Sequence, residues 1–390
     1  MSKSPDDRAI GRKRLPGQEG CTLGGHIIAL SLVSLSAVAV YGRRNSISLE
    51  KKNMHFIIMA ELICFFFIAF RATSVGLDTA TYEFYFNLSE GNSTYLLALG
   101  WEPLYRLITT VARRFGTFRF VMVACALITC TGFGVFAYRM SVDLKQNAYW
   151  FFFFYITLNL YFNSMHLMRQ MCAIAIVINI YPVLRRREKH KNLKCGLLLL
   201  AGLCFHILSV FAVAYFIPFF LTNDKKTIRR FILLTLLIIP LYGIGQQLLL
   251  RIPRLQRYAG DDRLSSGKAG VYSFIFILVK VVLVFAALKT NPKNPRNADL
   301  YRLSYIVIIS TAFYVLQFFS QFALRIGYYF EVFMLFYIPE VLNHFSDKRT
   351  KRILYIIFFI FGLTYFFYML SGVGGRGSNR GTVPYLLMWQ

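Results

Sequence analysis

Long apolar segments separated by short basic connectors dominate this chain of 390 residues. Hydrophobic residues make up 56% of the sequence and aromatic residues 17%, and the mean hydropathy is +0.51. Each of these values is higher than a soluble domain would show. Because a helix needs about 20 apolar residues to cross a bilayer, the pattern predicts an all-α, polytopic integral membrane protein.

The apolar segments are numerous enough for about 11 to 12 transmembrane helices, some of them short. We expect them at residues 24–41, 54–70, 118–138, 148–163, 167–184, 195–221, 229–250, 271–289, 301–320, 326–343 and 353–371. No internal repeat and no soluble domain is recognisable between them.

Lys and Arg are concentrated in the connectors. The chain has 44 Lys and Arg against 18 Asp and Glu, a formal net charge of +26. Such clusters are typical of cytoplasmic loops, so they argue against nucleic-acid binding. The four basic connectors at 185–191, 224–230, 289–296 and 347–352 all face the cytoplasm only if 195–221 is a short helical hairpin. We therefore expect this run to turn near His206.

The predicted topology divides the chain into three parts. Residues 1–22 are polar and basic and are expected to be a disordered tail. Residues 23–371 form a single transmembrane domain, and residues 372–390 an extracytoplasmic C-terminal tail. The basic N-terminal tail would then also lie outside, against the usual distribution of positive charge.

Residues 71–117 interrupt the apolar pattern and are predicted to form an extracytoplasmic loop. The loop contains four of the few carboxylates, Asp78, Glu83, Glu90 and Glu102. Near Glu102 an amphipathic helix is expected to begin. It has apolar residues on one face at helical spacing but is too short and too charged to span, so an interfacial helix lying on the membrane is predicted.

Three arginines, Arg71, Arg169 and Arg325, lie at the ends of predicted spans on the side of this loop. Ionisable groups at membrane depth usually line a cavity or a pathway. One guanidinium group can bind two phosphate oxygens at once, so we expect the three arginines to form an anion clamp, with Gln170 beside them. The alternative is that each arginine reaches to the lipid headgroups.

Asp78, Glu102 and His206 are the candidate catalytic groups, because a carboxylate or a neutral imidazole can take a proton from an attacking hydroxyl. Tyr82 lies one helical turn from Asp78 and is a candidate sugar-binding residue. Each has a structural alternative: a solvated loop acid for Asp78, a helix cap for Glu102 and a hydrogen-bonded core histidine for His206. Asp261 and Asp262 could bind a cation, but no further oxygen ligands are recognisable near them in the sequence. We therefore expect no metal and no cofactor.

Five motifs follow one another along most of the chain. They are F-R-A-T-S-V-G-L-D-T-A-T-Y near 70–82, W-E-P-L-Y at 101–105, M-R-Q at 168–170, F-H-I-L-S at 205–209, and Arg325 with Tyr328 and Tyr329. Their order and spacing resemble the EpsG family of polysaccharide polymerases, which are related in function to Wzy-type O-antigen polymerases. The family pattern carries over to Arg71, Gly76, Asp78, Tyr82, Glu102, Arg169, Gln170, His206, Ser209 and Arg325.

The resemblance implies a multi-pass glycosyltransferase of the bacterial inner membrane that works at its outer face. It would join undecaprenyl-diphosphate-linked repeat units into O-antigen, capsule or exopolysaccharide, with a flippase and a chain-length regulator as pathway partners. The leaving diphosphate would be stabilised by arginines without a metal. Alternatives are a flippase for the lipid-linked oligosaccharide, an O-antigen ligase, and a scaffold of an export complex.

Overall fold

The computed structural model describes residues 24–42, 47–90, 93–249, 271–294, 297–371, 381–383 and 385–389. Throughout these ranges the chain is helical except for short connectors and one isolated β-bridge between Arg71 and Leu387. The predicted all-α fold is confirmed. The predicted tail at 1–22, the acids Asp261 and Asp262, and residues 372–380 of the C-terminal tail lie outside the described residues.

Within the described ranges, six helices are long and apolar enough to cross a membrane. They are α1 (Gly24–Tyr41), α2 (Leu49–Ala69), α6 (Arg119–Leu144), α16 (Val271–Leu288), α17 (Ala298–Leu316) and α20 (Lys348–Ser371). A bent pair, α18 (Gln321–Glu331) and α19 (Met334–Asn343), would bring the number to seven if counted as one span, with an angle of 49° at the break.

Other predicted spans are also interrupted. Residues 148–163 form α7 (Tyr149–Thr157) and α8 (Leu160–His166), and residues 167–184 form α9 (Met168–Val177) and α10 (Ile180–Arg185). The first break falls at Asn159, whose φ of 78° lies in the left-handed region that ends helices. The predicted total of about 12 apolar segments is therefore recovered only if each interrupted pair counts as one segment.

The predicted hairpin at 195–221 is present. It consists of α11 (Lys191–Leu203), a 3₁₀ helix η2 (Ile207–Phe216) and a last turn α12 (Ile217–Phe220). The chain reverses at His206, and α11 packs against η2. At Gly202 an added Cβ would lie 3.0 Å from Ser209 Oγ and 2.3 Å from Val177 Cγ1, so only glycine permits this close approach.

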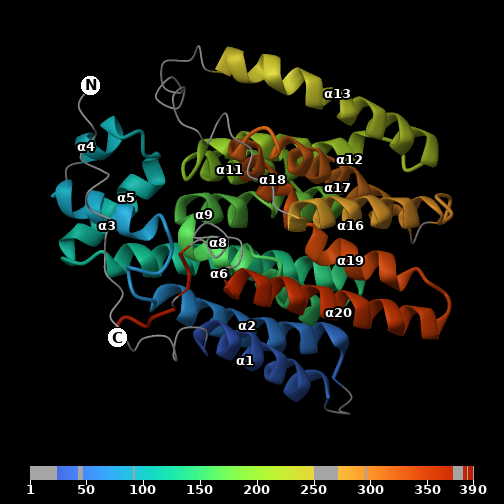
Figure 1. The fold of residues 1–390 in the computed structure, drawn as a ribbon, viewed down its shortest axis with the longest axis horizontal. Coiled ribbons are helices and arrows are strands. Elements are labelled where there is room, and N and C mark those ends of the chain that lie inside the picture. The colour runs from blue at the N-terminus through green and yellow to red at the C-terminus, as the bar shows by residue number, and fades with distance from the viewer. Residues whose placement is uncertain are drawn as a thin grey trace.

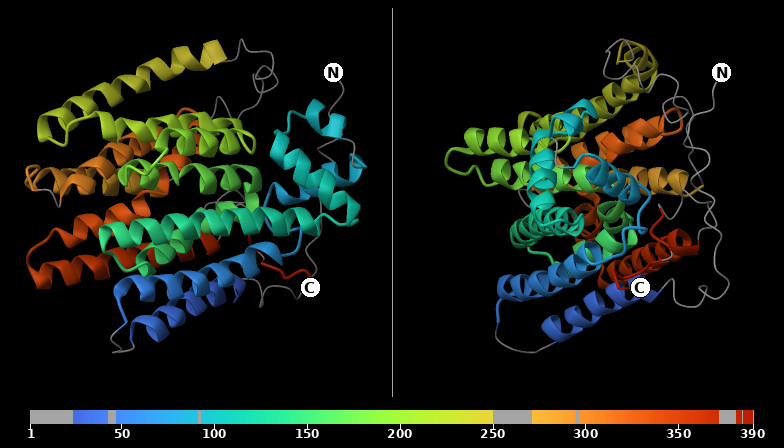
Figure 2. Two further views of the ribbon diagram at one scale, coloured as in Figure 1. Left: turned by 180° about the vertical axis from the view of Figure 1, so that it is seen from behind. Right: turned by 90° about the vertical axis from the view of Figure 1, so that its left-hand side faces the viewer.

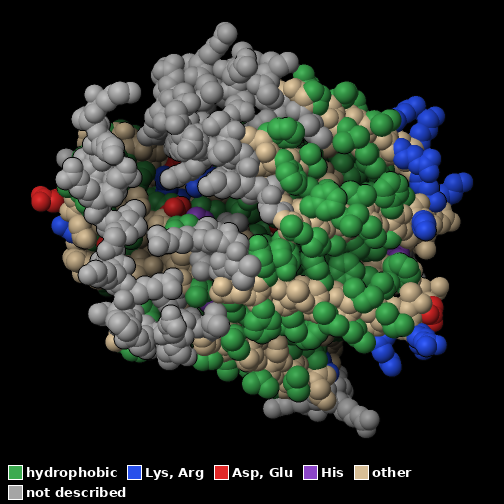
Figure 3. Space-filling model, in the orientation of Figure 1, with side chains coloured by type: hydrophobic (Ala, Val, Ile, Leu, Met, Phe, Trp, Pro, Cys, Tyr) green, Lys and Arg blue, Asp and Glu red, His purple; other side chains and the backbone are tan. Residues whose placement is uncertain are grey.

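The helices lie side by side along one direction and give the molecule two distinct ends (Figures 1 and 2). We call one the loop end; it carries the described parts of 71–117, namely α3 (Thr79–Leu88), α4 (Ser93–Ala98) and α5 (Pro103–Arg114). The other is the basic end, where Lys and Arg side chains cluster in Figure 3; it includes the turn before α13 (Lys225–Leu249). The start of α1 and the C-terminal segment meet at the loop end, where the His26 Nε2 to Thr382 O distance is 2.9 Å.

The helix predicted to begin near Glu102 is α5, which starts at Pro103. Its buried side, Tyr105 with Thr109 and Ala112, packs on α6. Its apolar residues Leu107 and Val111 are 57% and 47% exposed. Such a face suits contact with lipid.

Candidate active site

Arg71 holds the loop that follows α2. Its side chain is fully buried, and its guanidinium donates to Thr79 Oγ1 and to the carbonyls of Ile68, Val75 and Met165. All four acceptors are neutral and belong to the loop or to adjacent helices. These contacts favour a structural role over the predicted contact with a diphosphate, because the donors are already used.

Gly76 brings the same loop against the end of α8. Its φ is +99°, a conformation that favours glycine. An added Cβ would lie 2.8 Å from both Met165 O and Thr79 Oγ1. The glycine therefore sets how closely the start of α3 approaches α8, and with it the position of Asp78.

Asp78 occupies the N-cap position of α3 but makes no side-chain cap bond. Its Oδ2 lies 3.6 Å from Nδ1 of His166, the last residue of α8. The Asp78 side chain is 33% exposed and that of His166 is 10% exposed. His166 was not among the predicted site residues; its place in the break between two apolar segments, three residues before Arg169, was the signal that could have found it.

Arg169 lies near the start of α9 inside a cage of aromatic rings. Its guanidinium carbon is 5.5 Å from the ring centres of Tyr82 and Trp101 and 5.7 Å from that of Tyr105. Its Nη1 donates to Glu102 Oε2 at 2.7 Å. Rings and carboxylate fix the orientation of a cation that is 20% exposed.

Glu102 therefore acts as the counter-ion of Arg169. The residue does stand at the N-cap of α5, but its side chain makes no cap hydrogen bond. Its side chain is 10% exposed, so the ion pair is largely removed from water. Geometry thus favours a role in positioning Arg169 over the alternative of a helix cap.

Gln170 follows Arg169 in the sequence and contacts Arg325. It is 2% exposed, and its Nε2 donates to the main-chain carbonyl of Arg325 at 2.5 Å. Its Oε1 is buried and has no hydrogen-bond partner among the described residues. Gln170 thereby ties α18 to α9 next to Arg169, and it keeps an acceptor that suits a sugar hydroxyl.

Arg325 is half-buried on α18. In contrast to Arg169, its guanidinium makes no ion pair with any carboxylate in the part of the chain that the structure describes. The positive charge of Arg325 interacts electrostatically with Tyr82 and His206. The site therefore contains one neutralised arginine and one arginine whose charge is not balanced by a described acid.

His206 lies at the hairpin turn, at the N-cap of η2. Its Nδ1 accepts a hydrogen bond from the Leu208 N–H at 3.3 Å, and the charges of Arg169 and Arg325 both act on the ring. With Nδ1 engaged as an acceptor, the neutral ring carries its proton on Nε2. This tautomer suits donation to a substrate oxygen and disfavours the predicted role as general base.

A family comparison covers most of the chain. The model of the EpsG family matches residues 54–387. The chain belongs to the EpsG family. This is a family of Wzy-like polysaccharide polymerases. No curated protein and no solved structure matches the chain. The family match begins within α2, so α1 precedes it.

The candidate site of this EpsG-family protein is assembled at the loop end from several distant segments. In Figure 3, basic, acidic and histidine side chains gather in a recess at this end of the molecule. Direct contacts link Arg169 to Glu102 and Tyr82, and Gln170 to Arg325. Asp78 and His206 belong to the candidate site through their electrostatic interaction with these residues. Arg71 lies under the loop, where its guanidinium donates to Thr79 Oγ1 and to the Met165 carbonyl. Ser209 is buried behind the hairpin turn, with its Oγ 3.3 Å from the Tyr329 hydroxyl oxygen.

Proposed function

We propose that this EpsG-family protein joins lipid-diphosphate-linked oligosaccharide repeat units into a polysaccharide at the outer face of the bacterial inner membrane. The product would be an O-antigen, a capsule or an exopolysaccharide, and the lipid would be undecaprenol. The observation that carries the proposal is that the half-buried Arg325 meets no carboxylate among the described residues, whereas Arg169 is neutralised by Glu102.

A cation held at the edge of the membrane without a counter-ion is costly unless an anion visits it. A lipid diphosphate places its charge at this depth, because its chain remains in the bilayer. Guanidinium groups form charge-assisted hydrogen bonds with phosphate oxygens. In this proposal Arg325, Arg169 and the His206 Nε2–H stabilise the diphosphate as it leaves, which is where charge develops.

The transfer needs a group that accepts a proton. The acceptor hydroxyl oxygen forms a bond to the anomeric carbon of the donor, the bond from that carbon to the diphosphate oxygen breaks, and the hydroxyl proton goes to a base. Glu102 is engaged by Arg169. Asp78 is more exposed, at 33%, and its charge reaches Tyr82 at the site. We therefore assign the base to Asp78 and the positioning of Arg169 to Glu102.

The test is polymerisation by the purified full-length chain in liposomes, with undecaprenyl-diphosphate-linked repeat units as the only sugar source. Arg325→Ala should lower the rate at least about 100-fold, the usual effect of removing one donor to a developing anion. Arg325→Lys should recover only part of the rate, because the planar fork is lost. Arg114→Ala, an exposed arginine of α5 at the same end, is the matched control and should leave the rate unchanged.

An unchanged rate and chain-length distribution in Arg325→Ala would refute the diphosphate-binding role. A flippase is distinguished by the side on which substrate collects. In a strain lacking the gene, repeat units should accumulate unpolymerised outside the membrane. Accumulation inside would indicate translocation as the missing step and would overturn the proposal.

A further inference from the structure

The C-terminal segment returns to the loop end and lies along the loop that carries Asp78. We call its described residues, 381–383 and 385–389, the C-terminal strap. Three backbone hydrogen bonds join strap and loop: Met388 N–H to Phe70 O at 2.9 Å, Ala72 N–H to Leu386 O at 2.8 Å, and Gly76 N–H to Gly381 O at 2.7 Å. The antiparallel bridge between Arg71 and Leu387 lies between the first two. The loop is therefore paired with the strap along most of its length before Asp78.

The closest approach of strap and loop is at Gly381. Its φ is +67°, a conformation that favours glycine, and an added Cβ would lie 3.0 Å from Leu77 N. Gly76, to which its carbonyl is hydrogen-bonded, also has a positive φ. On the opposite side, Met165 O accepts hydrogen bonds from the loop and the start of α3. The loop is thus held on both sides just before Asp78.

The strap is itself anchored in the bundle by buried side chains. Thr382 and Tyr385 are 0% and 3% exposed, and the Tyr385 hydroxyl donates to Phe67 O at 2.8 Å. His26, near the start of α1, is fully buried and its Nε2–H donates to Thr382 O. An added Cβ at Gly25 would lie 2.1 Å from the Tyr385 ring. The start of α1 is therefore shaped to receive the strap.

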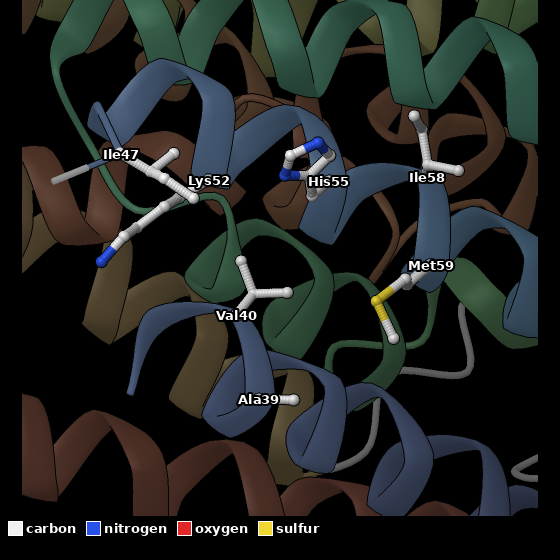
Figure 4. A pocket seen from close by; sticks show the side chains of 7 residues that line it. All are labelled: Ala39, Val40, Ile47, Lys52, His55, Ile58 and Met59. Atoms are coloured by element: carbon white, nitrogen blue, oxygen red, sulfur yellow. The ribbon is translucent and has the colours of Figure 1, made fainter. Parts of the chain in front are cut away.

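The two ends of α1 have different partners. At the basic end the Tyr41 hydroxyl donates to Asn53 Oδ1 at 2.6 Å, which joins α1 directly to α2. A pocket of about 400 Å³ lies between the two helices near that end, and Figure 4 shows His55 among the side chains that line it. At the loop end α1 contacts the strap through His26. Since α1 precedes the family match, this support for the loop comes from outside the matched region.

We propose that the C-terminal strap, anchored by His26, positions the loop so that Asp78 meets the acceptor hydroxyl. The inference rests on the proposed polymerisation and on Asp78 as its base. A displacement of about 1 Å can lower a rate about 100-fold, so a loop held on both sides favours transfer. Arg169 and Arg325 lie on α9 and α18, so binding of the lipid diphosphate should not depend on the strap.

Hydrogen–deuterium exchange of the full-length chain in nanodiscs tests the docking of the strap without any measurement of activity. Gly381→Val should raise the exchange rate of the Ala72 and Gly76 amides at least about tenfold, because the added side chain is forced against Leu77. Gly116→Val is the matched control, since Gly116 also has a positive φ, +76°, but open space around it. Unchanged exchange of both amides in Gly381→Val would overturn the proposal.

The anchoring role of His26 is tested in the same way. His26→Ala should raise the exchange rate of the Gly76 amide about fivefold, the effect of losing about one net hydrogen bond. His26→Gln keeps a donor for Thr382 O and should restore most of the protection. His55→Ala, an exposed histidine at the other end of the same helix pair, should leave the rate unchanged. An equal effect of His26→Gln and His26→Ala would refute the anchoring hydrogen bond.

Polymerisation then tests whether the strap acts through Asp78. In the liposome assay Gly381→Val should lower kcat at least about tenfold and change KM for the lipid-linked donor less than about twofold. Added to Asp78→Asn it should cause no further loss, because the position of an absent base no longer matters. Losses that multiply would show general damage and overturn the proposal. An unmodified chain that binds the lipid-linked units without joining them would count against the proposed function, and the exchange rates would still decide whether the strap holds the loop.

Discussion

The ion pair between Lys280 and Glu331 allows a quantitative test of how the bundle is held together. Lys280 lies on α16 and is fully buried, and the Glu331 side chain at the end of α18 is 3% exposed. Lys280 Nζ donates to Glu331 Oε2 and to Ser310 Oγ, the latter at 3.0 Å. The ammonium nitrogen also lies 3.3 Å from the ring centre of Tyr314. The pair thus fastens the broken span α18–α19 to α16 and α17.

Removing one partner leaves the other charge buried. We expect Lys280→Met and Glu331→Leu each to lower the free energy of unfolding by about 3–5 kcal/mol. Glu331→Leu should fall at the lower end, because the Tyr314 ring and the Ser310 hydroxyl still face the ammonium, and a cation–π contact contributes about 0.5–2 kcal/mol. The double variant should lose much less than the sum of the two, since apolar replacement of a buried pair is often close to neutral.

The measurement is a double-mutant cycle from reversible denaturant titration in mixed micelles. Val282→Leu, at a position of α16 that is 57% exposed, controls for substitutions on the lipid-facing side and should change the unfolding free energy little. If the double variant is destabilised by the full sum of Lys280→Met and Glu331→Leu, the two residues are not coupled and the reasoning is refuted.

Three further changes have defined outcomes. Gly76→Ala should reduce polymerisation at least about tenfold in correctly inserted protein. Gly116 also has a positive φ, +76°, but open space around it, so Gly116→Ala should leave activity near normal and lower the free energy of unfolding by about 1–2 kcal/mol. An equal loss of activity in both variants would contradict the close contact at Gly76. Tyr385→Ala removes a buried ring that lies 4.8 Å from the His26 ring and should lower stability by about 3–5 kcal/mol, whereas Trp389→Ala, at a position 62% exposed, should be nearly neutral in the same titration. Hydrogen bonds from two threonine hydroxyls hold the pKa of Asp224 at about 2, below its usual 3.8. The ionised carboxylate therefore stabilises the protein at neutral pH, and this stabilisation is lost as the pH falls from about 5 to about 2. Asp224→Asn should flatten the dependence of the melting temperature on pH in that window, and an unchanged slope would contradict the reasoning.

The fold class and the hairpin could be predicted from sequence because the membrane restricts the choices. Unpaired backbone groups cannot face lipid, so an apolar run must be helical, and the basic connectors then decide which runs reverse. Breaks such as that at Asn159 were not predicted. Hydropathy averages over a window and does not register a single residue in the left-handed conformation.

The candidate site was predicted only in part, and for a physical reason. The sequence indicates which charged side chains stand at the ends of apolar segments or in the acidic loop, so Arg169, Arg325 and Glu102 could be proposed from it. It does not indicate which of them pair with one another. That Arg169 is neutralised by Glu102, while Arg325 meets no described carboxylate, follows from where α5, α9 and α18 pack.

The contrast is clearest at Arg71 and His166. By sequence, Arg71 ends an apolar segment and looks like a phosphate ligand, whereas His166 is one polar residue in a break between segments. Tertiary structure surrounds the Arg71 guanidinium with carbonyls and brings His166 beside Asp78. Local composition is enough to specify a helical membrane bundle and the end at which its polar residues collect. Which polar group faces another depends on contacts between residues about 90 positions apart, and those exist only once the helices have packed.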